Sequence, residues 1–354
     1  VGEKKIREYL YGTLKDLPSP WLLKDMEKAV EILSEKIASH AKIRIIGDYD
    51  IDGVSSTFIL MKGLRRLGAQ VDTYIPDRVK DGYGIHRQLI EQAMEDQIDT
   101  IVTCDNGIAA SEEIAQAKED GMTVIVTDHH EIPYTDTEKG REWMIPPADA
   151  VINPKQSDCA YPNKNLCGAA VAWKLIWALY EKYKIPEEEI LEFSEAAAIA
   201  TVGDVMDLQG ENRIIVKEGL KRLENTKNPG LRALIAANGL EGGRITAYHV
   251  GFVLGPCINA SGRLDTASRS LKLLCEEDAD TAAREAGDLL ALNQSRKAMT
   301  EKGKEEAVRL IEETELKKDA VLVVYLPECH ESLAGIIAGR IREKYYKPVF
   351  VLTR

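Results

Sequence analysis

Short apolar runs alternate with helical patterns in the first third of the chain. Four runs of mostly apolar or β-branched residues are typical of buried strands, and segments with apolar residues at helical spacing separate them. Strands that alternate with helices at this spacing predict an α/β fold, in which helices flank both faces of a parallel sheet. The predicted strands are 43–46, 71–75, 100–104 and 123–127, and the predicted helices are 54–67, 86–95 and 111–120.

Segments on either side of this alternation complete the predicted architecture. Ser19 and Pro20 are expected to open a helix whose apolar residues continue to Ile37. Residues 166–223 have a mostly helical pattern, whereas residues 136–158 are expected to be rich in loops. Toward the C-terminus we predict one long helix or two in series, then a strand, a helix and a strand, at residues 280–315, 320–326, 332–345 and 348–352.

Composition and charge exclude several classes of protein. The 354 residues are 44% hydrophobic and 29% charged, which is typical of a globular protein and not of a disordered one. The net charge of −12 excludes a histone-like protein that binds nucleic acid by bulk charge, although a local basic groove stays compatible with it. Residues 1–7 lack the apolar run of a signal peptide, no later stretch is apolar over a membrane-spanning length, and the six cysteines form no CxxC pair. We therefore expect a cytoplasmic protein that does not bind a membrane and whose thiols are reduced.

Acidic and histidine residues directly follow three of the predicted strands, in the segments 47–53, 104–107 and 128–131. Because the carboxyl ends of parallel strands meet at one edge of a sheet, we expect these side chains to lie close together. Five clustered aspartates would repel one another unless cations neutralised them, and a mixture of carboxylates and imidazoles suits Mn²⁺ or Mg²⁺ better than Ca²⁺. The sequence therefore predicts a pair of metal ions. The five acids are Asp48, Asp50, Asp52, Asp105 and Asp128.

Other interpretations of these segments are weaker. An Asp-x-Asp-Gly sequence is common in surface turns, so each segment alone indicates little. An EF-hand is excluded because a strand and a helix flank residues 48–53, and because Ile59 occupies the twelfth loop position, where glutamate is needed. A P-loop is excluded because the Gly-Lys-Ser/Thr element is missing. The coincidence of three acidic strand ends is what supports a metal site.

The segments Gly47-Asp48-Tyr49-Asp50-Ile51-Asp52-Gly53 and Asp128-His129-His130 resemble the signature of the DHH phosphoesterase superfamily. Within it, the chain most resembles the RecJ family of single-strand-specific exonucleases, over residues 20–354. Five further motifs carry this finer resemblance and occur in the family's order. They are residues 80–84, 151–155, 166–175, 200–206 and 255–263.

Residue by residue, the resemblance implies a two-metal site. Two divalent cations, Mn²⁺ or Mg²⁺, would generate a nucleophilic water and clamp a phosphodiester. Asp105 is the candidate bridge between them, and His130 would bond to the phosphate or protonate the leaving oxygen. Together with His129, these are the implied catalytic residues. The implied metal ligands are Asp50, Asp105, His129 and Asp204, with Asp48 and Asp52 completing or supporting the second site.

Substrate contacts are expected from the second half of the chain. Asn259, Ser261 and Arg263 lie in what we predict to be a glycine-punctuated loop. His330 precedes a predicted helix that carries Arg340, in a stretch that resembles the beginning of the DHH-associated domain, where a phosphate or terminal nucleotide is held against the metals.

Four other positions bear on substrate binding. Ser55, near the start of the helix after the first acidic segment, is expected to hold a phosphate oxygen together with the helix amides. Tyr83 and His86 are candidates for stacking on bases. Cys257 stands where the family usually has an arginine, which removes one phosphate contact.

The function implied by the resemblance is 5′-to-3′ hydrolysis of single-stranded DNA in recombination and repair, with a helicase and a single-strand-binding protein as candidate partners. Two alternatives stay open: a DHH phosphodiesterase acting on short oligonucleotides or cyclic dinucleotides, and a non-catalytic scaffold that binds DNA or a replication protein. The expected organisation is a DHH phosphoesterase domain, a connecting helix and a partial DHH-associated domain, at residues 1–275, 276–316 and 317–354.

Overall fold

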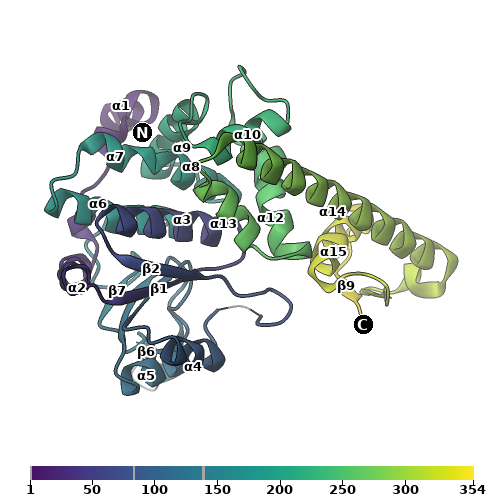
Figure 1. Cartoon of the computed structure of the whole chain (residues 1–354). Coiled ribbons are helices and arrows are strands. Elements are labelled where there is room, and N and C mark those ends of the chain that lie inside the picture. The colour runs from purple at the N-terminus through teal and green to yellow at the C-terminus, as the bar shows by residue number, and fades with distance from the viewer. Residues whose placement is uncertain (1, 83, 138–139) are drawn as a thin grey trace.

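The computed structural model describes residues 2–82, 84–137 and 140–354, and it confirms the predicted parallel sheet (Figure 1). Five parallel strands lie in the order β2-β1-β3-β4-β7. The direction of this order reverses between β1 and β3, and such a switch point opens a crevice at the carboxyl ends of the two strands. The strands are β1 (Lys42–Ile46), β2 (Gln70–Tyr74), β3 (Thr100–Cys104), β4 (Thr123–Thr127) and β7 (Ala150–Ile152).

Helices cover both faces of the sheet, as predicted (Figure 1). Alternate strand residues serve the two faces: Val102 packs into the core under α3 and α6, and its neighbour Ile101 packs into a smaller core under α4 and α5. Both side chains are fully buried. The helices around the sheet are α2 (Met26–Ala38), α3 (Ile51–Arg66), α4 (Arg87–Glu95), α5 (Ser111–Glu119) and α6 (Gly168–Lys182).

A helical layer lies above α3 and α6 and leads into one long helix, α14 (Ala279–Glu313), of 35 residues. This settles the choice between one helix and two over residues 280–315. No helix in the described part of the chain, α14 included, combines the length and the apolar character of a membrane span. The helices of the layer are α1 (Glu3–Tyr11), α7 (Glu187–Glu192), α8 (Ser194–Gly203), α9 (Gly210–Leu223), α10 (Pro229–Ala237), α11 (Ala247–His249), η3 (Val250–Leu254), α12 (Gly255–Leu264) and α13 (Ser268–Cys275).

The C-terminal elements form a third, separate apolar core against the far half of α14 (Figure 1). Two parallel strands, β8 (Leu322–Tyr325) and β9 (Val349–Leu352), enclose α15 (Glu331–Tyr345) in the chain order strand, helix, strand that the sequence predicts. The first residues of α15 also contact α12, so this unit closes against the helical layer.

Two predicted segments are wrong in detail. The first core helix does not open at Pro20, because a short 3₁₀ turn is followed by Asp25 with φ at 60°, and α2 begins only at Met26. The stretch predicted to be loop-rich contains β7, which has only three residues, too few to show a pattern, together with a hairpin of β5 (Tyr134–Thr137) and β6 (Gly140–Trp143).

Candidate metal centre

The turn after β1 places two carboxylates at the start of α3. Asp50 caps this helix, and its Oδ1 accepts hydrogen bonds from the N–H groups of Asp52 at 2.8 Å and Gly53 at 3.1 Å. A Cβ at Gly53 would lie 2.4 Å from the carbonyl oxygen of Asp48, so this close approach requires glycine. The turn buries Asp48, whose Oδ1 has no hydrogen-bond partner among the described residues.

The residue that follows β3, Asp105, has a backbone φ of 60°. This left-handed conformation is uncommon for a residue other than glycine, and such residues cluster at functional sites. A hydrogen bond of 3.1 Å from its N–H to the carbonyl oxygen of Thr127 holds it in place. On the other side a Cβ at Gly168 would lie 2.7 Å from the Cβ of Asp105, so α6 packs directly against it. The carboxylate is consequently buried between the sheet and α6.

His129, just after β4, is where carboxylates from three elements meet. Its Nε2 lies 3.0 Å from Asp105 Oδ1, 3.5 Å from Asp52 Oδ2 and 3.7 Å from Asp204 Oδ2. Asp204 reaches this point from the C-terminal end of α8. Burial lowers the pKa of His129, which favours the neutral imidazole, and this is the form that binds a metal ion.

Potential ligand atoms of this region form three groups, and within each group the atoms lie within 4.8 Å of one another. Because Asp105 and His129 each belong to two groups, the three groups are one connected cluster, which we call the metal centre. It brings together all six residues predicted as ligands and adds His130. The groups are Asp105–His129–His130, Asp52–His129–Asp204 and Asp48–Asp50–Asp105.

The carboxylates of the metal centre cannot all ionise without a counter-charge. Burial and the charge of Asp50 raise the pKa of Asp48 to about 7. Burial and the charges of Asp52 and Asp50 likewise raise the pKa of Asp204 to about 7, and burial raises the pKa of Asp105 well above its ordinary value. Divalent cations would remove this repulsion. Because the donors are carboxylate oxygens and imidazole nitrogens, the residues present fit Mn²⁺ or Mg²⁺.

Asp128 has a different role from the other acids. Its Oδ1 accepts from the N–H groups of His129 at 2.7 Å and His130 at 3.1 Å, and its Oδ2 accepts from Ile108 N–H at 2.9 Å. Oδ1 also contacts His130 Nδ1 at 2.8 Å. Burial disfavours the charge of His130, but the bond to Asp128 outweighs it and raises the pKa of His130. Asp128, which the sequence placed among the five clustered acids but not among the implied ligands, belongs to none of the three groups found among the described residues.

Asp52 joins the two helices that border the metal centre. Its two carboxylate oxygens accept hydrogen bonds from Gly168 N–H at 2.6 Å and Ala169 N–H at 2.7 Å, at the N-terminus of α6. Both oxygens of Asp52 already accept a hydrogen bond. This geometry favours a role for Asp52 in supporting the second metal site over a role as one of its ligands.

Comparisons with known proteins agree with this architecture. A family model described as "DHH family, N-terminal domain" matches residues 42–202. The single-stranded-DNA-specific exonuclease RecJ of Bacillus subtilis (strain 168) is 38% identical over 346 residues, which cover 98% of this chain and 42% of the relative. A crystal structure of exonuclease RecJ bound to manganese matches with a TM-score of 0.82 and 36% identity, over 94% of this chain and 80% of that one. The chain belongs to the RecJ family.

The RecJ of Escherichia coli (strain K12) is 37% identical over 345 residues, which cover 93% of this chain and 58% of the relative. This chain therefore spans about half the length of the two curated RecJ relatives. The DHH match begins at the first residue of β1 and ends before Asp204, so one potential ligand lies beyond it.

In this RecJ-family chain, residues 259–263 lie within α12, and the loop predicted there is wrong. The pattern of glycine and proline was misleading. Pro256 lies in the first turn of α12, where a proline is tolerated. Gly262 is needed for packing, because a Cβ there would lie 2.2 Å from the carbonyl oxygen of Tyr49.

Several residues predicted to bind substrate are engaged in the fold. Asn259 Oδ1 accepts from Ile51 N–H at 2.8 Å and so fixes the start of α3 next to the metal centre. Ser261 is fully buried, and its Oγ donates to the carbonyl oxygen of Ile258 at 2.9 Å. Ser55 is buried within α3, and its Oγ has no hydrogen-bond partner among the described residues.

Arg263 links α12 to the C-terminal unit. Its Nη1 donates to the carbonyl oxygen of Ser332 at 2.9 Å, and Ser332 Oγ donates back to the carbonyl oxygen of Arg263 at 2.8 Å. Burial and the nearby charges of Arg78 and Arg296 lower the pKa of Arg263 to about 10. Such crowding of cations would be relieved by an anion such as a phosphate.

The two remaining candidates lie on α15. His330 caps this helix, with its Nδ1 accepting from Ser332 N–H at 3.3 Å, so the ring serves the fold. Arg340 is exposed and lies 3.3 Å from Glu343.

The loop after β2 contributes a residue that sequence reasoning missed. The guanidinium of Arg78 lies over the ring of Tyr49 at 4.3 Å from its centre. Its charge also acts on Asp48 and Arg263. Of the two residues proposed for base stacking, Tyr83 lies outside the described residues, and His86 precedes α4 with its Nε2 buried.

A groove of about 570 Å³ between α12, α14 and α15 adjoins Arg263. We call it the basic groove. Three of its cations, Arg296, Lys297 and Lys304, come from α14. The sequence predicts only a connecting role for this helix, because charged residues on a long helix are usually solvated. The groove could not be predicted from the sequence pattern of α14, because it forms only where α12, α14 and α15 pack together. The groove is lined by Phe252, Pro256, Asn259, Arg263, Arg296, Lys297, Thr300, Glu301, Lys304, Ile336 and Arg340.

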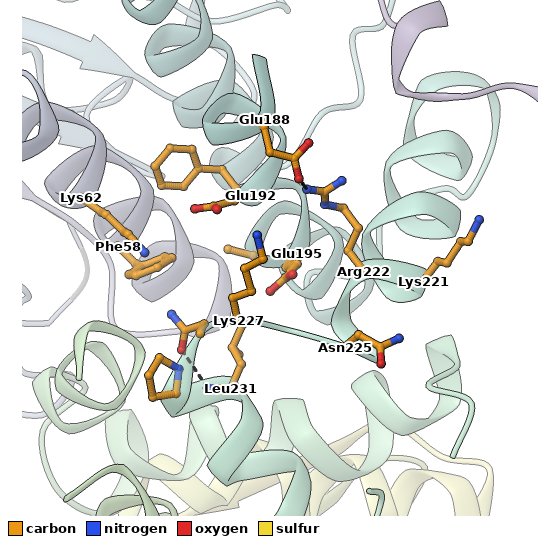
Figure 2. Close-up of a pocket in the computed structure, with 14 residues that line it drawn as sticks. Phe58, Lys62, Glu188, Glu192, Glu195, Lys221, Arg222, Asn225, Lys227 and Leu231 are labelled. Carbon is orange, nitrogen blue, oxygen red and sulfur yellow. Dashed lines mark hydrogen bonds and ion pairs between the residues drawn. The ribbon is translucent and has the colours of Figure 1, made fainter. Parts of the chain in front are cut away.

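A different pocket, of about 280 Å³, lies against the second half of α3 (Figure 2). It contains none of the residues predicted for the site. One of its cations is paired with an acid, since Arg222 donates to Glu188 at 2.9 Å, and another acid, Glu195, accepts from the hydroxyl of Thr226 at 2.5 Å. The metal centre with the adjoining basic groove is therefore the candidate functional site.

Proposed function

We propose that this chain is a two-metal phosphodiesterase that removes nucleotides from single-stranded DNA in the 5′-to-3′ direction. The observation that carries the proposal is the metal centre, in which Asp105 and His129 each belong to two groups of ligand atoms. A pair of adjoining cation sites is the arrangement used by many nucleases and phosphatases. RecJ relatives of this chain are named as single-stranded-DNA-specific exonucleases.

The proposed cofactors are two Mn²⁺ or Mg²⁺ ions. When bound, they would lower the pKa of a water molecule and neutralise charge on the phosphate. Solved RecJ structures contain manganese or magnesium. In this chain Asp48, Asp50, Asp105, His129 and Asp204 would hold the ions, since their donor atoms are grouped and their buried charges need neutralising.

His130 is the proposed acid. Asp128 holds its Nδ1 and raises its pKa, so the ring keeps its proton to a higher pH than an ordinary histidine. A protonated ring beside the phosphate would donate a hydrogen bond to a phosphate oxygen or a proton to the leaving oxygen. Asp128 acts through His130 and through the backbone that it holds at His129, and it is a positioning residue.

The basic groove is the proposed path of the strand. Arg263 lies at its inner end, where it also experiences the charge of Asp50, and Arg340 lies on its α15 side. Cations on three helices can track a phosphate backbone even though the chain as a whole carries a charge of −12. A helicase and a single-strand-binding protein, as partners that hand over the strand, and a cytoplasmic location belong to the same proposal.

The test is digestion of end-labelled DNA in the presence of Mn²⁺. Substrates are a single strand labelled at either end, the matching duplex, a 5-mer and a cyclic dinucleotide. We expect stepwise shortening of the single strand from the 5′ end, with the duplex left intact. The variant Asp105→Asn keeps the size and polarity of the side chain but not its charge, so it should neither bind Mn²⁺ nor cut.

Other outcomes would overturn the proposal in distinct ways. Cleavage confined to the 5-mer or the cyclic dinucleotide would indicate a small-substrate phosphodiesterase. Bound Mn²⁺ without any cleavage would indicate a DNA-binding scaffold. A melting curve of Asp105→Asn that matches the parent protein excludes misfolding as the reason for lost activity.

A further inference from the structure

Two aromatic side chains project into solvent on the helical segment that precedes α12. Tyr248 is 63% exposed and Phe252 is 67% exposed. Their ring centres lie 5.0 Å apart and the ring planes differ by 30°, so the rings lie against each other. Large aromatic rings are usually buried, and two adjacent ones left in water suggest a binding surface. We call Tyr248 and Phe252 the aromatic pair.

The backbone explains why these rings face outward. The segment Val250–Leu254 is a π-helical turn, in which Gly255 N–H bonds to the carbonyl oxygen of Val250. Pro256 has no N–H to give to the carbonyl of Phe252, so the α-helical hydrogen-bond pattern is interrupted at the end of this turn, and single π-turns of this kind are frequent at functional sites. Val250 and Leu254 are both buried, so the turn is anchored in the core while Phe252 points away from it. Such rigid support is typical of a preformed contact surface.

The aromatic pair lies at one end of the basic groove. Phe252 lines the groove together with Arg263 and Arg296. Arg263 is eleven residues further along the same helical segment, about 16 Å at 1.5 Å per residue. Arg263 is also the groove residue that experiences the charge of Asp50 in the metal centre. The groove therefore connects the aromatic pair with the metal centre through a lining rich in cations.

We propose that the aromatic pair is a stacking platform for a nucleobase of a single strand whose phosphates lie in the basic groove. This inference rests on the proposed function. Every base has a flat π-face, so stacking on aromatic rings is independent of sequence. An unpaired strand can turn a base onto a protein ring without first breaking a base pair, whereas a duplex must break one. The platform would thus favour single strands over duplexes, at a site several nucleotides from the bond that is cut.

The test compares a strand with bases and a strand without them. The probes are fluorescein-labelled (dT)₂₀ and an abasic 20-mer, and binding is measured by anisotropy in the uncleaving Asp105→Asn background. We expect Phe252→Ala to weaken binding of (dT)₂₀ by about tenfold, since one base-aromatic stack is worth about that much, and to leave the abasic strand unchanged. Tyr248→Ala should act in the same direction, and Phe252→Trp should restore the parent's affinity.

A matched control is available in the β5–β6 hairpin. Tyr134 and Trp143 are also exposed and have ring centres 5.2 Å apart, but the hairpin lies beside α4 and α5, away from α14 (Figure 1). Tyr134→Ala should bind both probes like the parent. Because Phe252 is exposed, Phe252→Ala should also melt like the parent, which excludes a folding defect.

The outcomes separate this inference from the proposed function. If the background protein binds neither probe and the wild type does not cut DNA, the proposed function fails. If the wild type cuts single strands but Phe252→Ala binds (dT)₂₀ like the parent, or loses equal affinity for both probes, the platform is overturned and the proposed function stands.

Discussion

The metal centre and the basic groove both collect charged side chains, but they hold them in opposite ways. In the metal centre the negatively charged side chains of Asp48, Asp52 and Asp105 are buried close together, and Asp48 Oδ1 has no hydrogen-bond partner among the described residues. In the basic groove the cations lie on three separate helices, and Arg340 is largely exposed. The first region requires ions from outside to balance its charge, whereas water already solvates most of the second.

This difference predicts how each region responds to substitution. The ligands of the metal centre hold the ions together, so replacing any one of them should abolish catalytic activity. Exposed cations in the groove, such as Arg340, act nearly independently through a screened field, so losing one should weaken binding slightly and in a salt-dependent way. The predictions below test this contrast, beginning with the largest expected effect.

The largest effect is expected at Asp50, where charge can be separated from helix capping. Asparagine caps a helix as well as aspartate does, so Asp50→Asn should keep both hydrogen bonds to the start of α3. It removes a ligand charge, and we expect activity to fall by about a thousandfold with Mn²⁺ present. Asp50→Ala should lose as much activity and also about 1 kcal/mol of stability. Retained activity in Asp50→Asn would exclude this residue as a ligand.

The next effect concerns Asp128, which orients His130 without joining the ligand groups. We expect Asp128→Asn to lower kcat by about 10- to 100-fold, as is usual for residues that support a metal site. The pKa of His130 is raised by Asp128, so removing the charge should lower that pKa and move the alkaline fall of activity to lower pH. The bound Mn²⁺ should stay the same. A loss of activity with an unshifted pH profile would indicate a purely structural role.

A smaller effect is expected on the stability of the metal-free protein. The pKa of Asp48 is near 7 in the folded state against an ordinary 3.8, so between about pH 4 and 7 the folded chain holds a proton that the unfolded chain has lost. This contribution to stability is present at low pH and is lost as pH rises through 7. We therefore expect wild type in EDTA to melt below Asp48→Asn at both pH values, by a smaller margin at pH 5 and by a few degrees more at pH 8.

Adding Mn²⁺ gives the control for this experiment. Cations bind the ionised carboxylates of the folded protein, so Mn²⁺ should raise the melting temperature of wild type more at pH 8 than at pH 5. Asp48→Asn should gain less from Mn²⁺ at pH 8. Melting curves that differ from wild type equally at both pH values would contradict the buried, proton-holding state of Asp48.

How much of the metal centre was predictable depends on whether each residue shows a local signal. Asp48, Asp50, Asp105 and His129 directly follow strands whose apolar runs are clear, so sheet geometry alone places them together. Asp204 has no such signal, because it ends an alanine-rich helix, and only the family resemblance indicated it.

The fold shows the same dependence on local signals. Strands β1 to β4 were predictable, but β7 has three residues and its place depends on pairing with β4. The helix α12 was mistaken for a loop because Gly262 is required by a contact with Tyr49, which is distant in sequence. The role of Asp128 depends on the conformation of its loop, which the residue types do not reveal.

The smallest effect is expected in the basic groove, at Arg340. Its side chain is 62% exposed and contacts Glu343, so Arg340→Gln should leave folding and metal binding intact. We expect single-stranded DNA to bind a few-fold more weakly, and the slope of log K against log salt to decrease by about 1, as for the loss of one phosphate contact. Lys302→Gln removes the same charge from an exposed position on α14 that does not line the groove, so it should change neither value. If both variants lost affinity equally, Arg340 would act only through the overall electrostatic field of the protein and not through a phosphate contact in the groove. The groove would then not bind DNA through separate local contacts, and the contrast with the interdependent ligands of the metal centre would be wrong.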